Sequence, residues 1–361
     1  MQSMFANALS GLVSQHSGLA PSRCETLAWL VVLITRFGSV CLWRLAAHVE
    51  SRAELASVRR RISRFFQYVR LDGAIAARIV VALLGLEGKP WVLAIDRTNW
   101  RFGRSTINLL MIAVEWNGVG IPLLWSLLPK EGNSAMSERM TLLDRLAEAF
   151  PKMRVAALTG DREFIGQAWM RTLAERHIPF DLRLRANQMV HREGYAPMSI
   201  ANIAQTLKPG EKRLLKELCR LGDMAPFVRI VILRLASGEL LALATSGKPR
   251  SALARYRRRW RIETLFANLK SKGFNLEDTH ITQPQRLATL IALSAKSGAL
   301  SIARKPIPLK AHGRPAASLF AHGRASLCRL LASPDQRSIL AKLRQPLGIS
   351  PACPNSMYCQ V

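Results

Sequence analysis

The sequence predicts an α/β fold in which a helical domain is followed by a mixed sheet flanked by helices. First, residues 1–85 carry apolar side chains at spacings of three and four, with no strand-like alternation. Second, short apolar runs separated by Gly, Asn and charged residues begin at Lys89, and these are typical of buried strands. Third, 361 residues with 49% hydrophobic content can bury a sizeable core, which we expect to be divided into about two or three domains.

The charge balance indicates a polyanionic partner. The chain has 52 Lys and Arg against 24 Asp and Glu, a formal net charge of +28. Such a surplus favours nucleic acid over a ribosome-like or membrane-surface role, because each neutralised phosphate releases counterions. Apolar runs shorter than the roughly 20 residues of a membrane span, and a start unlike a signal peptide, predict a cytoplasmic protein with no membrane partner. The six scattered cysteines contain no CxxC pair and predict neither a zinc site nor a disulfide framework.

The helical domain, residues 1–85, contains a candidate DNA-binding helix. The stretch "LWRLAAHVESRAELASVRRRISRFFQYVR" predicts a helix, a turn near Glu50–Arg52 and a second helix that carries Arg59, Arg60 and Arg64. This arrangement fits a helix-turn-helix whose basic helix lies on DNA. An ordinary basic surface helix explains the same residues equally well, so both interpretations stay open.

Residues 86–185 form the first part of the predicted core. Strands are expected in "PWVLAIDRTNW", "INLLMIAVEW", "IPLLWSLLP", "VAALTG" and "PFDLRLR". One helix is expected from Ser137, as its N-cap, to Ala149, and a second follows Asp161 and ends near His177.

The remaining segments are expected to extend and complete this core. Residues 186–250 are less regular and end in alternating runs around Ser237-Gly238, which predict a β-hairpin. Residues 251–305 return to a helical pattern and form the last part of the core. Residues 306–361 are a basic tail rich in Pro, Gly and Arg, which we consider a candidate for dimerisation.

The stretch "RYRRRWRIETLFANLK" predicts a helix that contains a single acid among many cations. At about 100° per residue, Tyr256, Arg259, Glu263 and Lys270 share an arc of roughly 60°, and the apolar residues lie roughly 100° away. The helix therefore presents a hydroxyl, two cations and a carboxylate on one face. A solvated basic face with an Arg259–Glu263 pair at i, i+4 spacing is the alternative.

Two other acids each follow an apolar run that predicts a buried strand. Asp96 closes "WVLAI" and Asp161 closes "VAALTG". A carboxylate at such a position is desolvated unless something compensates it, and a divalent metal is one such compensation. Pairing with the neighbouring Arg97 or Arg162 is the alternative for each residue taken alone.

Taken together, the acids predict a metal site. A sheet with two acids at strand ends and a helix carrying Glu263 beside it can bring three carboxylates together. Such oxygen ligands suit Mg²⁺ or Mn²⁺. Two ions roughly 4 Å apart can activate a water or 3′-hydroxyl and stabilise the leaving oxygen of a phosphodiester. Glu163 and Glu115 compete for this role, but a helix-start acid and a solvent-facing strand residue explain them adequately.

These motifs resemble those of the DDE transposases of bacterial insertion sequences. The insertion-sequence four (IS-four) branch has the signature Tyr, two residues, Arg, three residues, Glu, six residues, Lys, and Tyr256, Arg259, Glu263 and Lys270 match it without gaps. "AIDRTNWRFG" and "TGDREF" resemble the two aspartate motifs of the same family. The resemblance extends over residues 30–330.

The resemblance implies an RNase H-like sheet with a β-rich insertion, which corresponds to residues 186–250. It implies a transposase that binds terminal inverted repeats, nicks double-stranded DNA there and joins the freed 3′-hydroxyl to target DNA as a homodimer, in the nucleoid of a bacterium. Asp96, Asp161 and Glu263 would hold two Mg²⁺ or Mn²⁺ ions. Tyr256, Arg259 and Lys270 would hold phosphates of the transposon ends. A non-enzymatic DNA-binding relic and an RNase H-like cellular nuclease remain as alternatives.

Overall fold

The N-terminal residues form a cluster of helices, as predicted. The computed structural model describes residues 2–71, 73–102, 105–276, 281, 283–300, 307–310, 317 and 319–332. The first helices are α1 (Gln2–Ser17), α2 (Pro21–Phe37), α3 (Leu42–Ala46), α4 (Leu55–Tyr68) and α5 (Gly73–Leu84). The turn expected near Glu50–Arg52 lies between α3 and α4. Most of the basic tail falls outside the described residues, which include α12 (Leu319–Ala332).

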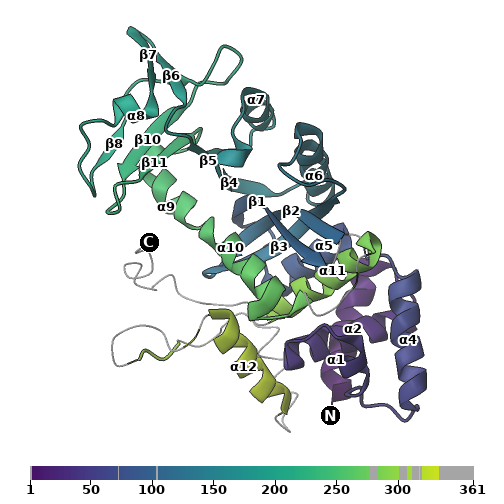
Figure 1. Ribbon diagram of the computed structural model, residues 1–361. Coiled ribbons are helices and arrows are strands. Elements are labelled where there is room, and N and C mark those ends of the chain that lie inside the picture. The colour runs from purple at the N-terminus through teal and green to yellow at the C-terminus, as the bar shows by residue number, and fades with distance from the viewer. Residues whose placement is uncertain are drawn as a thin grey trace.

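A mixed sheet of eight strands forms the centre of the molecule (Figure 1). Its strands are β1 (Pro90–Phe102), β2 (Ser105–Trp116), β3 (Val119–Leu128), β4 (Arg154–Gly160), β5 (Phe180–Leu184), β8 (Lys212–Leu214), β10 (Arg229–Arg234) and β11 (Leu240–Thr245). They lie in the order β3-β2-β1-β4-β5-β11-β10-β8. The first three strands pair antiparallel, and β4 and β5 run parallel to β1. This is the RNase H-like mixed sheet, flanked by helices, that the resemblance implied.

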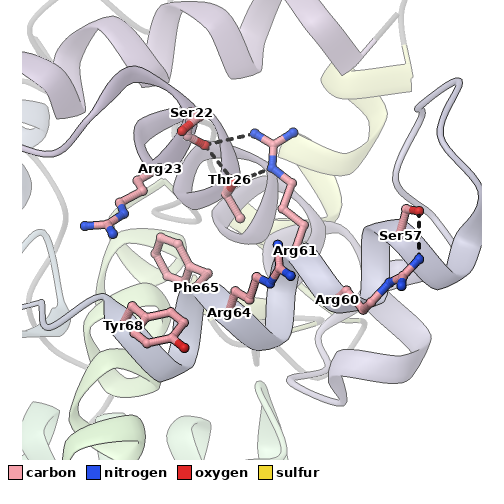
Figure 2. A pocket seen from close by; sticks show the side chains of 9 residues that line it. All are labelled: Ser22, Arg23, Thr26, Ser57, Arg60, Arg61, Arg64, Phe65 and Tyr68. Atoms are coloured by element: carbon pink, nitrogen blue, oxygen red, sulfur yellow. Dashed lines mark hydrogen bonds between the residues drawn. The ribbon is translucent and has the colours of Figure 1, made fainter.

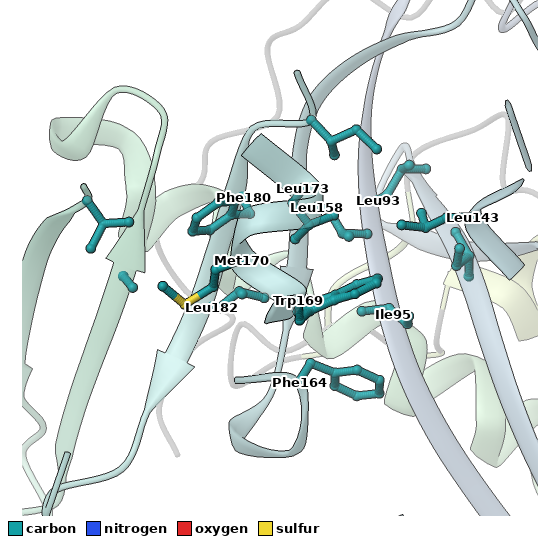
Figure 3. Close-up of a cluster of buried hydrophobic side chains, with 14 of the residues drawn as sticks. Leu93, Ile95, Leu143, Leu158, Phe164, Trp169, Met170, Leu173, Phe180 and Leu182 are labelled. Carbon is teal, nitrogen blue, oxygen red and sulfur yellow. The ribbon is translucent and has the colours of Figure 1, made fainter. Parts of the chain in front are cut away.

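Both faces of the sheet are buried, which explains why its strands read as continuous apolar runs. Alternate residues of β2 point to opposite faces: Leu110, Ile112 and Val114 to one, and Leu109, Met111 and Ala113 to the other. The first face packs against α6 (Met136–Ala149) and α7 (Gln167–Glu175) through the side chains in Figure 3. The second packs against the N-terminal helices, α10 (Trp260–Ala267) and α11 (Pro284–Leu300).

The segment 186–250 is rich in strands and only partly separate from the core. β6 (Met189–Arg192), β7 (Tyr195–Ser199) and β9 (Cys219–Arg220) form a small sheet of their own, next to the short helix α8 (Ile200–Ile203). In contrast, β8, β10 and β11 continue the main sheet, since β11 pairs with β5. The hairpin predicted at Ser237-Gly238 is confirmed and joins β10 to β11.

Two local predictions are wrong. β1 does not end at Asp96, because its pairing with β2 continues to Phe102 although its pairing with β4 stops at Ile95. Ser137 is not the N-cap of α6, because that position is occupied by Ala135, whose N–H donates to the Glu138 carboxylate at 2.5 Å. Within the described residues, every helix is too short or too polar to cross a membrane.

Candidate active site

The three predicted acids line one open cleft. Asp96 points to the sheet face that α10 covers, since Ala94, two residues earlier, packs in the core on that face. Asp161 directly follows β4, whose last residue pairs with Ile95. Glu263 lies on α10 and lines the same cleft as the two aspartates. The cleft measures about 520 Å³ and is lined by Asp96, Arg97, Thr98, Asp161, Arg259, Glu263, Phe266, Ala267 and Lys270.

Arg259 joins two of these acids. Its Nη1 lies 2.8 Å from Asp96 Oδ2 and its Nη2 lies 2.5 Å from Glu263 Oε1, so one guanidinium bridges both carboxylates. The side chain is only 8% exposed. Burial lowers the pKa of Arg259, but Tyr256, Asp96, Asp161 and Glu263 more than offset this and hold it above its ordinary value. The expected i, i+4 ion pair is therefore present, as part of a larger bridge.

Asp96 is the acid that burial perturbs most clearly. Desolvation raises its pKa from 3.8 to about 6, against the opposing effects of the Arg259 charge and the Arg97 backbone N–H. That N–H donates to Oδ1 at 2.8 Å, while Oδ2 accepts from Arg259. Both oxygens thus accept hydrogen bonds, but these interactions do not fully offset the cost of burying the charged carboxylate.

Tyr256 contacts the second aspartate. Its hydroxyl donates to Asp161 Oδ1 at 3.4 Å, and the residue is 6% exposed. Burial raises the pKa of Tyr256 to about 12, so the phenol stays protonated at neutral pH. Tyr256 and Arg259, which we predicted as DNA contacts, therefore face the acids in this structure.

The signature segment is not the continuous α-helix that we predicted. It consists of α9 (Ala252–Arg257), a tight turn, α10 and a π-helical turn at Asn268–Lys272. In the tight turn the Arg259 N–H bonds to the Tyr256 carbonyl, three residues back, at 2.9 Å. The π-turn carries Lys270, whose Nζ donates to the Asn99 carbonyl of β1 at 2.7 Å. All four signature side chains therefore still face the strands that carry the aspartates.

Comparison with known proteins bears directly on this cleft. The family model of the transposase DDE domain matches residues 87–297, which include every residue lining the cleft. The chain belongs to this family.

Other comparisons add less to this identification. The transposase is similar to the cryo-EM structure of the piggyBac transposase synaptic complex with hairpin DNA, with a TM-score of 0.41 and 12% identity over 98% of this chain and 83% of that one. No curated protein matches its sequence.

DDE domains use divalent metal ions, and the donor set of the transposase fits such a group. The three carboxylates supply the oxygen ligands that Mg²⁺ and Mn²⁺ prefer. Two of them already hold a shared cation, the Arg259 guanidinium. Within the described residues, however, no three Asp, Glu, His or Cys side chains are close enough together to hold a metal ion as they stand.

The two competing acids have other partners in the transposase. Glu163 accepts hydrogen bonds from the Ser134 N–H at 2.9 Å and from Arg97 Nε at 3.3 Å, and the second bond joins the segments that follow the two aspartates. Glu115 accepts from the Gly118 N–H at 2.8 Å. Both acids therefore have structural partners that account for them.

Two positions that support the site were missed in the sequence. A Cβ on Gly120 would lie 2.5 Å from the Arg261 carbonyl oxygen, so this glycine allows α10 to pack directly on β3. Asp181 is fully buried and binds Arg255 at 2.6 and 2.8 Å, which anchors α9 to β5. A glycine inside a strand and an acid inside an apolar run were the available signals.

The predicted DNA-binding arginines of the N-terminal domain differ in their surroundings. Arg60 and Arg64 are exposed and line a groove between α2 and α4 (Figure 2). Arg61, in the same groove, is bound to Glu25 at 2.7 Å. Arg59 instead stacks on Trp43, with 3.4 Å between the guanidinium carbon and the ring centroid.

Proposed function

We propose that this transposase binds the terminal inverted repeats of an insertion sequence and catalyses metal-dependent cleavage and strand transfer of double-stranded DNA. The observation that carries the proposal is the convergence of Asp96, Asp161 and Glu263 on one cleft. The same cleft contains Arg259 and Lys270, so ligands for a metal and cations for a phosphate lie together. The matched signature supports placement in the IS-four branch, and a bacterial nucleoid as the location follows from that placement.

The metal would be held by Asp96, Asp161 and Glu263, as two Mg²⁺ or Mn²⁺ ions. When bound, this group would supply an activated water or 3′-hydroxyl and stabilise the leaving oxygen. Asp96 is suited to it because its carboxylate is buried and incompletely compensated.

The cations and the phenol of the signature would position the scissile strand. Arg259 is pinned between two acids, and their neutralisation would free its planar fork to bind a phosphate. Lys270 sits at the rim of the same cleft. Tyr256 would hold Asp161 in place through its hydroxyl and then turn that donor to the strand.

The N-terminal arginines would bind the transposon ends away from the cleft. Arg60 and Arg64 are exposed on α4 (Figure 2). The half-buried Arg59 adds a third cation along the same helix. Exposed cations in a row neutralise successive phosphates of a duplex. Joining two ends requires two sets of these surfaces, so we propose that the transposase acts as a homodimer on DNA.

The proposal is tested with purified protein and the DNA that flanks its own gene, with and without Mg²⁺. Wild type is compared with Glu263→Gln and with Glu148→Gln, an exposed acid on α6 that serves as the matched control. We expect breaks at an inverted-repeat boundary that require Mg²⁺, lose at least about 100-fold in rate in Glu263→Gln and persist in the control.

Other outcomes would contradict specific parts of the proposal. Metal-dependent cutting that is indifferent to Glu263 would show that a different acid is the third ligand. Binding without cleavage would identify a relic, and cleavage of branched or hybrid nucleic acid without strand joining would identify a nuclease.

A further inference from the structure

Two arginines beside the cleft, Arg162 and Arg183, bind a carboxylate from the β-rich segment. Glu239 lies between the hairpin turn at Ser237-Gly238 and the first residue of β11. Its Oε1 lies 2.6 Å from Nη2 of Arg162 and 2.6 Å from Nη2 of Arg183. Arg162 belongs to the short 3-10 turn at Arg162–Phe164, and Arg183 belongs to β5. One oxygen atom thus receives two charged donors from two different elements.

This arginine pair is adjacent to a residue of the proposed metal site. Arg162 directly follows Asp161 in the chain. Arg183 Nη1 lies 3.8 Å from Asp161 Oδ1. A strand whose phosphate reaches the cleft would therefore pass within reach of these two guanidinium groups.

The contact of Glu239 with Arg162 and Arg183 resembles a phosphate-binding site that is occupied by a carboxylate. Guanidinium groups bind carboxylate and phosphate oxygens with the same geometry, and each offers five N–H donors. The contact with Glu239 uses one terminal nitrogen of each. The contact is accessible from the Glu239 and Arg162 side, where the side chains are 52% and 43% exposed, whereas Arg183 is 17% exposed. Exchange of one anion for another would leave both arginines paired.

We propose that Arg162 and Arg183 form a binding site for a backbone phosphate of DNA, and that the Glu239 carboxylate occupies this site until a phosphate displaces it. The inference rests on the proposed function only in taking DNA as the ligand. It adds a contact outside the signature, and it makes the β10–β11 hairpin a competitor for the DNA strand. Removal of the carboxylate should therefore strengthen DNA binding even without metal.

The test measures duplex DNA binding by the full chain in EDTA, by fluorescence anisotropy. Glu239→Gln is compared with Glu193→Gln, which changes the net charge equally at an exposed position in the turn between β6 and β7. We expect Kd to fall about three- to tenfold in Glu239→Gln relative to this control, because the two ion pairs of Glu239 no longer compete with the phosphate. Glu239→Asp keeps the charge but shortens the side chain, and it should also lower Kd.

A double variant links the effect to the arginines. In Arg162→Gln the additional change Glu239→Gln should bring a smaller gain than in wild type, since only the Arg183 ion pair is then competed. Equal affinities of Glu239→Gln and Glu193→Gln, or a gain of undiminished size in Arg162→Gln, would overturn the proposal. Thermal melting verifies that each variant is folded.

The outcome is separable from that of the proposed function. If wild type cleaves transposon ends but Glu239→Gln behaves as the control does, the phosphate site is wrong and the transposase proposal stands. If no cleavage occurs yet Glu239→Gln binds DNA more tightly through Arg162, the phosphate site stands and the cleavage proposal fails.

Discussion

At the scale of single residues, Arg259 decides the electrostatics of the site. Its guanidinium neutralises parts of two carboxylates that would otherwise repel each other in a desolvated cleft. Even so, Asp96 keeps a raised pKa, because burial outweighs the attraction of this neighbour. The metal-free cleft is therefore unfavourable for full ionisation, and a divalent cation would relieve it.

This imbalance predicts how stability depends on pH in the absence of metal. The pKa of Asp96 is about 6 in the folded protein against an ordinary 3.8, so folding favours the protonated form. The contribution of protonated Asp96 to the free energy of unfolding is fully present below about pH 4 and is lost as pH rises through about 6. Relative to wild type, Asp96→Asn should therefore gain up to about 3 kcal/mol of unfolding free energy between pH 4 and pH 7. Urea unfolding in EDTA measures this difference, and parallel pH profiles for the two proteins would contradict it.

At the scale of elements, the position of α10 depends on how closely it approaches β3. Gly120 permits backbone contact at a point where a Cβ would lie 2.5 Å from a carbonyl oxygen of α10. The helix carries Glu263, so its distance from the sheet also sets the distance between that acid and Asp96. On the N-terminal side of α10, the buried Asp181–Arg255 ion pair anchors α9 to β5.

Gly120→Ala tests this packing. We expect a loss of about 1–3 kcal/mol in unfolding free energy, because a backbone atom cannot move aside as a flexible side chain can. DNA cleavage should fall as well, since α10 and Glu263 move away from the strands. Denaturant unfolding and the cleavage assay provide the two readouts.

The control for this variant is Gly11→Ala. Gly11 lies in α1, and a Cβ there meets nothing within 4 Å. An alanine at that position should be neutral or should stabilise the helix by up to about 1 kcal/mol. Equal effects of the two substitutions would contradict the role assigned to Gly120.

At the scale of the whole molecule, cations that could bind DNA phosphates line two separate regions. One is the cleft of the RNase H-like core, and the other is the groove between α2 and α4. A net charge of +28 is consistent with a long track of bound phosphates rather than one local site. Binding to DNA should therefore be strongly dependent on salt.

The N-terminal part of that track can be measured separately. Arg60→Gln combined with Arg64→Gln should flatten the slope of log K against log salt by about 0.9 for each phosphate that the variant no longer neutralises. Cleavage at saturating DNA should be unaffected, because neither residue lies in the cleft. The control is Arg154→Gln, an exposed residue at the end of β4 remote from Asp161. A slope equal to that of the control would indicate an ordinary basic surface.

The sequence by itself determined the class of the fold, most element positions and the residues that meet in the cleft. Periodicity is a local property, so the strands of the core and the helices around them could be predicted from the pattern of apolar residues. The spacing of Tyr256, Arg259, Glu263 and Lys270 likewise predicted a shared face. That face persists although the predicted single helix is divided by a tight turn and a π-turn.

Only the tertiary structure decided which groups compensate one another. β1 continues past Asp96 because β2 supplies its hydrogen bonds, and no local pattern contains that partner. The same holds for Arg259 between two acids and for Glu239 between Arg162 and Arg183, which are ion pairs across long separations in the chain. Ion pairs depend on distance and burial, and both are fixed by packing rather than by residue type.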